Sequence, residues 1–180
     1  MPEYKLVDPF LNLPADPNDK TRVIDPNIAR WFKDSKAMIH GATIEEMVAD
    51  MDETDIECGI VTASSGGVPD RPYQVGQNNS DEALDKVLTK VAGMMKQYPG
   101  RFYGCVGIDP TGVMTAVRQL ERAVRDYGMT SCWMMPSLVG LPPNHAVYFP
   151  IIKQPEAILR RLRLQESDFS LFHPIAPAFV

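Results

Sequence analysis

Apolar residues recur at helical spacing in three stretches of the chain, and each stretch is followed by a short run of strand-forming residues. The helical stretches are expected at 43–58, 80–98 and 113–127, and the strands that follow them at 60–63, 102–108 and 129–135. A further strand is expected at Tyr4–Asp8. Strands separated by helices must run parallel, with each helix as a crossover connection. The pattern therefore predicts an α/β fold with about four parallel strands and flanking helices.

Local residues sharpen these boundaries. Thr43 and Glu46 have the spacing of a capping box at the start of the first helix, and Gly59 is its expected stop. Ser80 is the expected N-cap of the second helix. The central strand, 102–108, is bounded by proline and glycine on one side and by proline on the other.

Composition limits the classes of function. The chain has 180 residues, a formal net charge of −5 and 44% hydrophobic residues, which is enough for one globular core. Mild acidity argues against a nucleic-acid partner, and no apolar run is long enough to span a membrane. Three widely spaced cysteines, Cys58, Cys105 and Cys132, form no CxxC pair. We therefore expect free thiols in a cytoplasmic protein, with Cys105 and Cys132 as small buried hydrophobes.

Candidate chemistry lies after the strands, because α/β folds place their sites at the carboxyl ends of the strands. Asp109 follows the central strand and His145 follows the fourth strand, so both are candidate catalytic residues. Ordinary turn chemistry is an alternative for Asp109, and a hydrogen-bonded surface residue is an alternative for His145. The glycine-rich loop at 64–79 lacks the Gly-Lys-Ser/Thr ending of a phosphate-binding loop.

Several motifs in this order resemble the amidohydrolase-related family, the branch that contains aminocarboxymuconate-semialdehyde decarboxylase. They are Tyr98-Pro-Gly-Arg-Phe102, Gly104, Ile108-Asp-Pro110 and the segment Asn144–Pro150. The resemblance implies a TIM-like (β/α)8 barrel with a divalent metal, usually zinc, at its carboxyl face. It also implies metal-dependent hydrolysis or non-oxidative decarboxylation of a small, often aromatic, carboxylic acid.

The expected metal ligands differ from that pattern. Family members end the first strand with Asp-x-His-x-His, whereas this chain has Asp8-Pro-Phe-Leu-Asn12. Phe10 and Asn12 therefore stand at the two histidine positions. Phe10 cannot bind a metal, and Asn12 offers only an amide oxygen that suits harder ions than zinc. Asp8 is either a remaining ligand or a partner of nearby backbone, so we expect no intact metal site and no bound metal.

Length is the second difference, because a complete barrel of this kind needs about 250 residues. We expect a partial barrel domain at residues 1–150 and a divergent basic and apolar tail at 151–180. A frameshift or truncation near Ile151 would explain both features and would leave the chain inactive.

Two other hypotheses remain open. In one, the chain is a non-catalytic assembly partner that associates through its open barrel edge, for example as a homo-oligomer. In the other, a full-length relative works without metal and uses Asp109 or His145 as acid or base.

Overall fold

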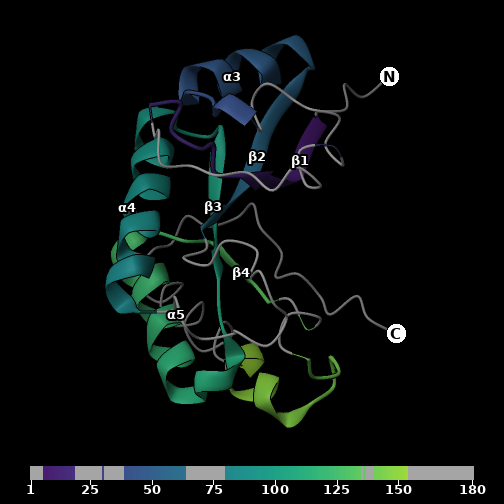
Figure 1. Cartoon of the computed structure of the whole chain (residues 1–180), viewed down its shortest axis with the longest axis vertical. Helices are drawn as coiled ribbons and strands as arrows, with labels where there is room; N and C mark the ends of the chain where they lie inside the picture. Colours follow the sequence, from purple (N-terminus) through teal and green to yellow (C-terminus); the bar gives the residue numbers. More distant parts are fainter. Residues whose placement is uncertain are drawn as a thin grey trace, which may run out of the picture.

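A parallel sheet with the strand order β1-β2-β3-β4 forms the centre of the molecule. The computed structural model describes residues 6–18, 30, 39–63, 80–134, 136 and 140–153. The strands are β1 (Leu6–Asn12), β2 (Ile56–Ala63), β3 (Phe102–Gly107) and β4 (Ser131–Trp133). They are joined in sequence through the helices α3 (Ile44–Glu53), α4 (Asp81–Gln97) and α5 (Val113–Tyr127). The chain thus forms a half-barrel with flanking helices, as the alternating pattern predicts (Figure 1).

The helices begin where the sequence places their caps. Thr43 Oγ1 accepts a hydrogen bond from the Glu46 backbone, and the Glu46 carboxylate accepts one from the Thr43 backbone at 2.8 Å. Ser80 Oγ accepts the Ala83 N–H at the start of α4. These bonds satisfy amide groups that have no partner inside the helix.

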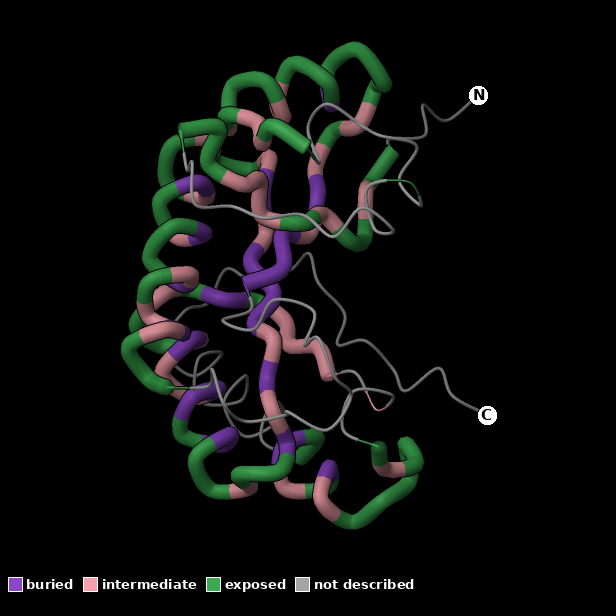
Figure 2. The backbone as a smooth tube through the Cα atoms, viewed as in Figure 1, coloured by how far each residue is buried: buried purple, intermediate pink, exposed green. Residues whose placement is uncertain are grey.

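The core lies between one face of the sheet and the helices α4 and α5, which lie side by side along it (Figure 1). Val61 and Ala63 of β2, and Val106 of β3, are fully buried and belong to one apolar cluster with Leu88 and other residues of α4. Buried positions accordingly follow the central strands and the inward sides of these two helices (Figure 2). Because side chains alternate along a strand, residues between these positions face the opposite, inner side of the half-barrel.

The first two strands are longer than predicted. β2 begins at Ile56 and not at residue 60. β1 continues past Asp8 to Asn12, and beyond Pro9 its residues Leu11 and Asn12 still pair with Val61 and Thr62. Proline is tolerated here because β1 is the edge strand of the described sheet, and the register shifts between Asp8 and Leu11.

The first helix ends earlier than expected, at Glu53 rather than near Cys58. Asp55 adopts a positive φ of 57°, and the Thr54 hydroxyl donates to the Asp50 carbonyl at 2.7 Å. The predicted stop, Gly59, lies inside β2 instead, where a side chain would collide with Leu11. A tight turn at Thr54–Asp55 therefore ends the helix, whereas the sequence predicted that Gly59 would end it.

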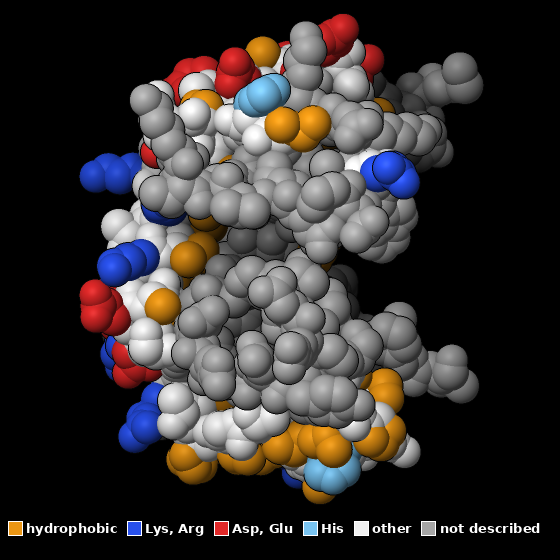
Figure 3. Space-filling model, viewed as in Figure 1, with side chains coloured by type: hydrophobic (Ala, Val, Ile, Leu, Met, Phe, Trp, Pro, Cys, Tyr) orange, Lys and Arg blue, Asp and Glu red, His pale blue; other side chains and the backbone are white. Residues whose placement is uncertain are grey.

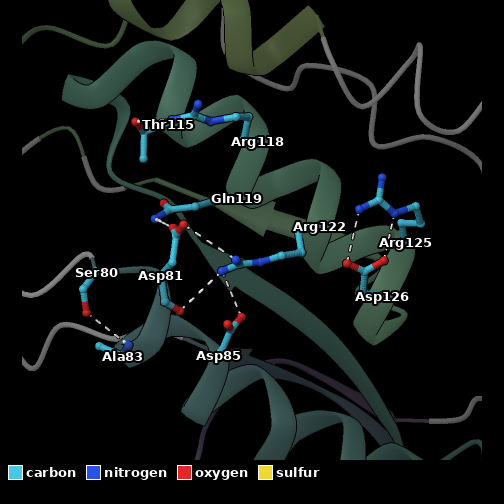
Figure 4. A network of polar contacts seen from close by, with 10 residues as sticks. All are labelled: Ser80, Asp81, Ala83, Asp85, Thr115, Arg118, Gln119, Arg122, Arg125 and Asp126. Atoms are coloured by element: carbon cyan, nitrogen blue, oxygen red, sulfur yellow. Dashed lines mark hydrogen bonds and ion pairs between the residues drawn. The ribbon is translucent and has the colours of Figure 1, made fainter.

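Polar contacts fix the helices from outside the core. At the amino ends of the strands, Arg101 contacts Asp52 at 2.7 Å and donates to the Ile56 carbonyl. Between α4 and α5, Arg122 contacts Asp85 at 2.9 Å and Asp81 at 3.7 Å (Figure 4). Gln119 also donates to the Asp81 carboxylate.

The regular elements β4 and η2, in the carboxyl-terminal part of the described chain, are short. β4 covers fewer residues than the predicted 129–135, and η2 (Ala146–Tyr148) leads into helical residues 149–153. Tyr148 and Ile151 are buried, whereas Phe149 and Ile152 are about half exposed. Hydrophobic side chains gather at this end of the molecule (Figure 3). The loop at 64–79 and residues 154–180 lie outside the described residues, so the predicted tail domain stays a prediction.

None of the helices in the described ranges is long and apolar enough to cross a membrane.

Two glycines provide opposite tests of the packing. A Cβ at Gly104 would overlap the sulfur of Met129, which is only 2% exposed and has little room to move. We expect Gly104→Ala to lower the free energy of unfolding by about 1–3 kcal/mol.

Gly93, in α4, has no neighbour within 4 Å of such a Cβ. Gly93→Ala should raise the stability by about 0.5–1 kcal/mol, because alanine restricts the unfolded chain. Urea unfolding followed by circular dichroism would measure both, and equal effects would contradict the packing.

Candidate functional site

The inner face of the half-barrel carries a row of neutral polar residues. Strand register pairs Asn12 with Thr62, Thr62 with Cys105, and Cys105 with Ser131. Residues paired in this way lie on one face of a sheet, and this face is opposite to that of Val61 and Val106. The row therefore faces away from the helices, toward the position of a barrel interior.

Two aromatic rings meet across this inner face. Phe10 of β1 and Trp133 of β4 lie edge to face, with ring centroids 5.9 Å apart and an interplanar angle of 86°. Their strands are at opposite ends of the strand order. In a flat sheet such strands would be separated by about 14 Å, from a spacing of about 4.8 Å per strand. The contact is therefore made possible by curvature of the sheet.

The residues at this position do not fit the metal that the sequence resemblance implies. Phe10 offers a hydrocarbon ring, Asn12 an amide, and Trp133 an N–H that can only donate. A divalent cation requires lone pairs from thiolate, imidazole or oxygen ligands. Across the described ranges no three His, Cys, Asp or Glu side chains are grouped so that they could hold a metal ion.

Asp8 is committed to its own backbone. Its carboxylate accepts the Phe10 N–H at 2.9 Å, two residues further along β1. This bond corresponds to the second of the two interpretations offered above for Asp8. The carboxylate thus fixes the backbone that presents Phe10.

Asp109 follows β3, at the end of the strand where the sequence places it. Its carboxylate accepts hydrogen bonds from the backbone N–H of Thr111 at 2.9 Å and from its hydroxyl at 2.7 Å. These bonds cap the short helix η1 (Pro110–Gly112). The geometry is that of turn chemistry, and a catalytic role for Asp109 stays a prediction.

His145 has the same kind of role at η2. Its Nδ1 accepts the Val147 N–H at 3.3 Å, and the side chain is otherwise exposed. η1 and η2 contact each other, so the structure brings the two capped turns together. Each side chain nevertheless bonds to its own turn. His40 is exposed at a distant part of the chain, and His173 lies outside the described residues.

The two thiols at β3 and β4 are poor nucleophiles. Burial raises the pKa of Cys105, and the neighbouring Ser131 offsets only part of that effect. Burial also raises the pKa of Cys132, to about 11, with a smaller contribution from Cys105. Cys105 and Cys132 form no disulfide. The thiols at Cys105 and Cys132 thus behave as the sequence suggests, as small apolar groups.

Comparison with known proteins identifies the fold. No protein-family model and no curated protein matches the sequence. Among solved structures, the chain is similar to a protein assigned as an amidohydrolase from Staphylococcus aureus, with 19% identity and a TM-score of 0.55. That match covers 85% of this chain and 44% of the other. A 2,6-dihydroxybenzoate decarboxylase, in complex with 2,6-dihydroxybenzoate, matches with 15% identity and a TM-score of 0.53. That match covers 94% of this chain and 56% of the decarboxylase.

The two matched proteins are described as an amidohydrolase and a decarboxylase, the two kinds of enzyme to which the sequence motifs are similar. The chain has the fold of one part of these proteins and spans about half their length. At this level of identity the similarity shows the fold alone, which is part of a TIM barrel.

The sequence pattern did not predict the inner row of polar residues or the contact between Phe10 and Trp133. Alternation within the fourth strand could place Trp133 on one face, but it could not decide between the interior and the helices. Register with β3 settles this, because Trp133 pairs with Gly107 on the inner face. A contact between Phe10 and Trp133 leaves no periodic signal, since the two residues come from opposite ends of the described sheet.

The raised pKa of Cys132 predicts a loss of stability in alkali. In the unfolded chain the thiol ionises near its ordinary pKa of 9.0, whereas in the folded chain it stays protonated to about 11. The unfolded state therefore releases its proton first, and the free energy of unfolding falls as the pH rises through this range. Cys132→Ala should show a shallower fall in urea unfolding measured at several pH values. Parallel curves for the variant and the wild type would contradict the shift.

Proposed function

We propose that this chain is an amidohydrolase-related protein of the branch that hydrolyses or decarboxylates small carboxylic acids. We propose further that the chain alone does not turn over such an acid. The half-barrel fold and the motif around β3 support the relationship. The observation that carries the second statement is the contact between Phe10 and Trp133, where the resemblance implies a metal-binding histidine.

The other candidate groups support the same proposal. A general acid or base must be free to reach a substrate proton. The Asp109 carboxylate is engaged by Thr111, and the acceptor nitrogen of His145 by Val147. Neither side chain is oriented by a second catalytic group among the described residues, as a catalytic pair would require. The buried thiols resist ionisation and supply no nucleophile.

A decarboxylation assay tests this proposal. We expect purified chain, incubated with zinc and 2,6-dihydroxybenzoate, to release carbon dioxide no faster than the protein-free solution. The reason is the lack of a ligand at Phe10 and of a free acid or base nearby. Carbon dioxide release that depends on the protein and stops on addition of a chelator would overturn the inactivity. Hydrolysis of an ester or amide of the acid releases the free acid and an alcohol or amine, so chromatography of the free acid, with the same controls, would test the hydrolytic alternative.

A second candidate function is assembly through the open edges of the half-barrel. Within the described residues β1 and β4 each pair with one strand only. On β1, Leu6 and Val7 are 54% and 53% exposed. Unpaired strand edges next to exposed apolar side chains favour association with another chain. A second copy, or a full-length relative, would supply the missing strands.

Sedimentation velocity tests the assembly. We expect the wild-type chain to form a dimer or larger species at micromolar concentration. Val7→Lys should shift it toward monomer, because the charge cannot be buried at the joined edge. The matched control is Met114→Lys, which places the same charge at a residue of α5 that is 66% exposed. A monomeric wild-type protein, or equal effects of the two variants, would exclude the edge as the interface.

A further inference from the structure

The two edges of the described sheet are suited to meet each other in a ring. The four strands run parallel in the order β1-β2-β3-β4, so within the described residues β1 and β4 each pair with one strand. The contact between Phe10 and Trp133 shows that the sheet curves toward its inner face, as closure of a barrel requires. A second copy, related by a twofold axis along the strands, would place β4 of each copy beside β1 of the other. The result is eight parallel strands in closed cyclic order.

The inner face is compatible with a second copy of itself because its row of paired residues carries no charge. Asn12, Thr62, Cys105 and Ser131 are neutral, so two such rows can face each other across one axis without like-charge repulsion. The interior of a barrel is filled by layers of side chains from its strands. The ring of Phe10, which is half exposed in the single copy, would be surrounded by such side chains in the closed barrel.

Both flanks of the half-barrel expose apolar side chains. At the β1 flank, Leu6 and Val7 are about half exposed. At the β4 flank, Phe149 and Ile152 are also about half exposed and belong to the helical residues 149–153. In a barrel of alternating strands and helices, the helix after each strand packs outside the seam with the next strand. The helix that begins at Phe149 would therefore cover the seam with β1 of the second copy, and both exposed apolar flanks would lie in one interface.

The helix α3, which follows β1, would be the next helix around the ring, and it is strongly acidic. It carries five acidic side chains and no basic one. Glu45 accepts a hydrogen bond from α4, and Asp52 contacts Arg101, which follows α4, so these two acids lie on the side of α3 toward α4. Asp50 is exposed and lies about 140–160° away from them, at about 100° per residue. It is thus on the flank where a preceding helix would lie.

The segment that begins at Phe149 has the opposite charge. Between residues 149 and 163 it has four basic residues and one acidic residue. Lys153 is exposed. Both helices start on the carboxyl side of the sheet, and Asp50 lies about 9 Å along α3 while Lys153 lies about 6 Å along its helix, at about 1.5 Å per residue. Opposite charges at a similar depth favour α3 of a second copy as the neighbour of this helix.

We propose that two copies of this chain close into one eight-stranded barrel, in which β4 of each copy lies beside β1 of the other and Lys153 faces Asp50 of the second copy. This inference rests on the edge assembly proposed above and goes beyond it. It identifies the partner as an identical chain, and it specifies which edges meet. It also limits the assembly to two copies, because a closed ring leaves no strand edge to which a third copy could add.

Charge variants test the proposed seam by sedimentation velocity. We expect the wild-type chain to form a dimer and no larger species. Asp50→Lys and Lys153→Glu each place like charges at both seams, so each should raise the dissociation constant of the dimer about tenfold. An equal mixture of the two variants should restore the dimer, because each seam of the mixed dimer then joins opposite charges. A loss of folding in either variant would not be repaired by mixing.

Lys90→Glu is the matched control. Lys90 is an exposed residue of α4, which is on neither flank of the half-barrel, and the substitution makes the same change of charge as Lys153→Glu. It should leave the dissociation constant unchanged. Circular dichroism of each variant verifies that it is folded.

Three outcomes would overturn the proposal. They are a wild-type chain that is monomeric or larger than a dimer, charge variants that dimerise as well as the control, and a mixture that dimerises no better than its two components. If Val7→Lys dissociates the dimer but mixing the charge variants does not restore it, the edge assembly proposed above stands and the closed ring fails. None of these outcomes depends on whether the chain turns over a carboxylic acid.

Discussion

The packing of one sheet face against α4 and α5 is the constraint on which the remainder of the molecule depends. Val61, Ala63 and Val106 can be buried there only if β2 and β3 keep a fixed register, because a shift of one residue would turn them to the other face. That register also decides which residues face inward. Gly104 allows Met129 to approach the sheet closely, so β4 can join it at the correct distance. The strand register that buries residues on the outer face therefore also determines which residues form the inner row and the aromatic pair.

Much of this arrangement could be predicted from the sequence, since it follows from local signals. The apolar stripes and the caps at Thr43 and Ser80 located the helices, and the strand at 102–108 was correct to within a residue. The errors came from residues whose behaviour depends on tertiary context. Pro9 reads as a strand breaker but is accepted at an edge, and Asp55 adopts a backbone conformation that favours glycine.

The site was predicted less well than the fold, for a physical reason. Sequence position placed Asp109 and His145 after their strands, but it could not show that each caps the turn that follows. A carboxylate or imidazole at a strand end serves equally well as a cap or as a catalytic group, and the choice depends on neighbours distant in sequence. At Phe10 the sequence was more informative, because a phenyl ring excludes metal binding in any surroundings. What it could not provide was the partner of that ring.

Asp8 and Pro9 limit how another strand could pair with the outer edge of β1. Proline has no amide proton, and the amide of Phe10 is already taken by the Asp8 carboxylate. Two successive residues of β1 therefore have no donor to offer. Neighbouring residues of a strand direct their amides to opposite sides, so the outward side lacks a donor at this point whichever residue faces it. An added strand would therefore be interrupted at this point, and near Leu6 and Val7 it could pair only over a short length. Such an edge permits a limited, specific contact and resists the continuous backbone pairing that builds fibrils.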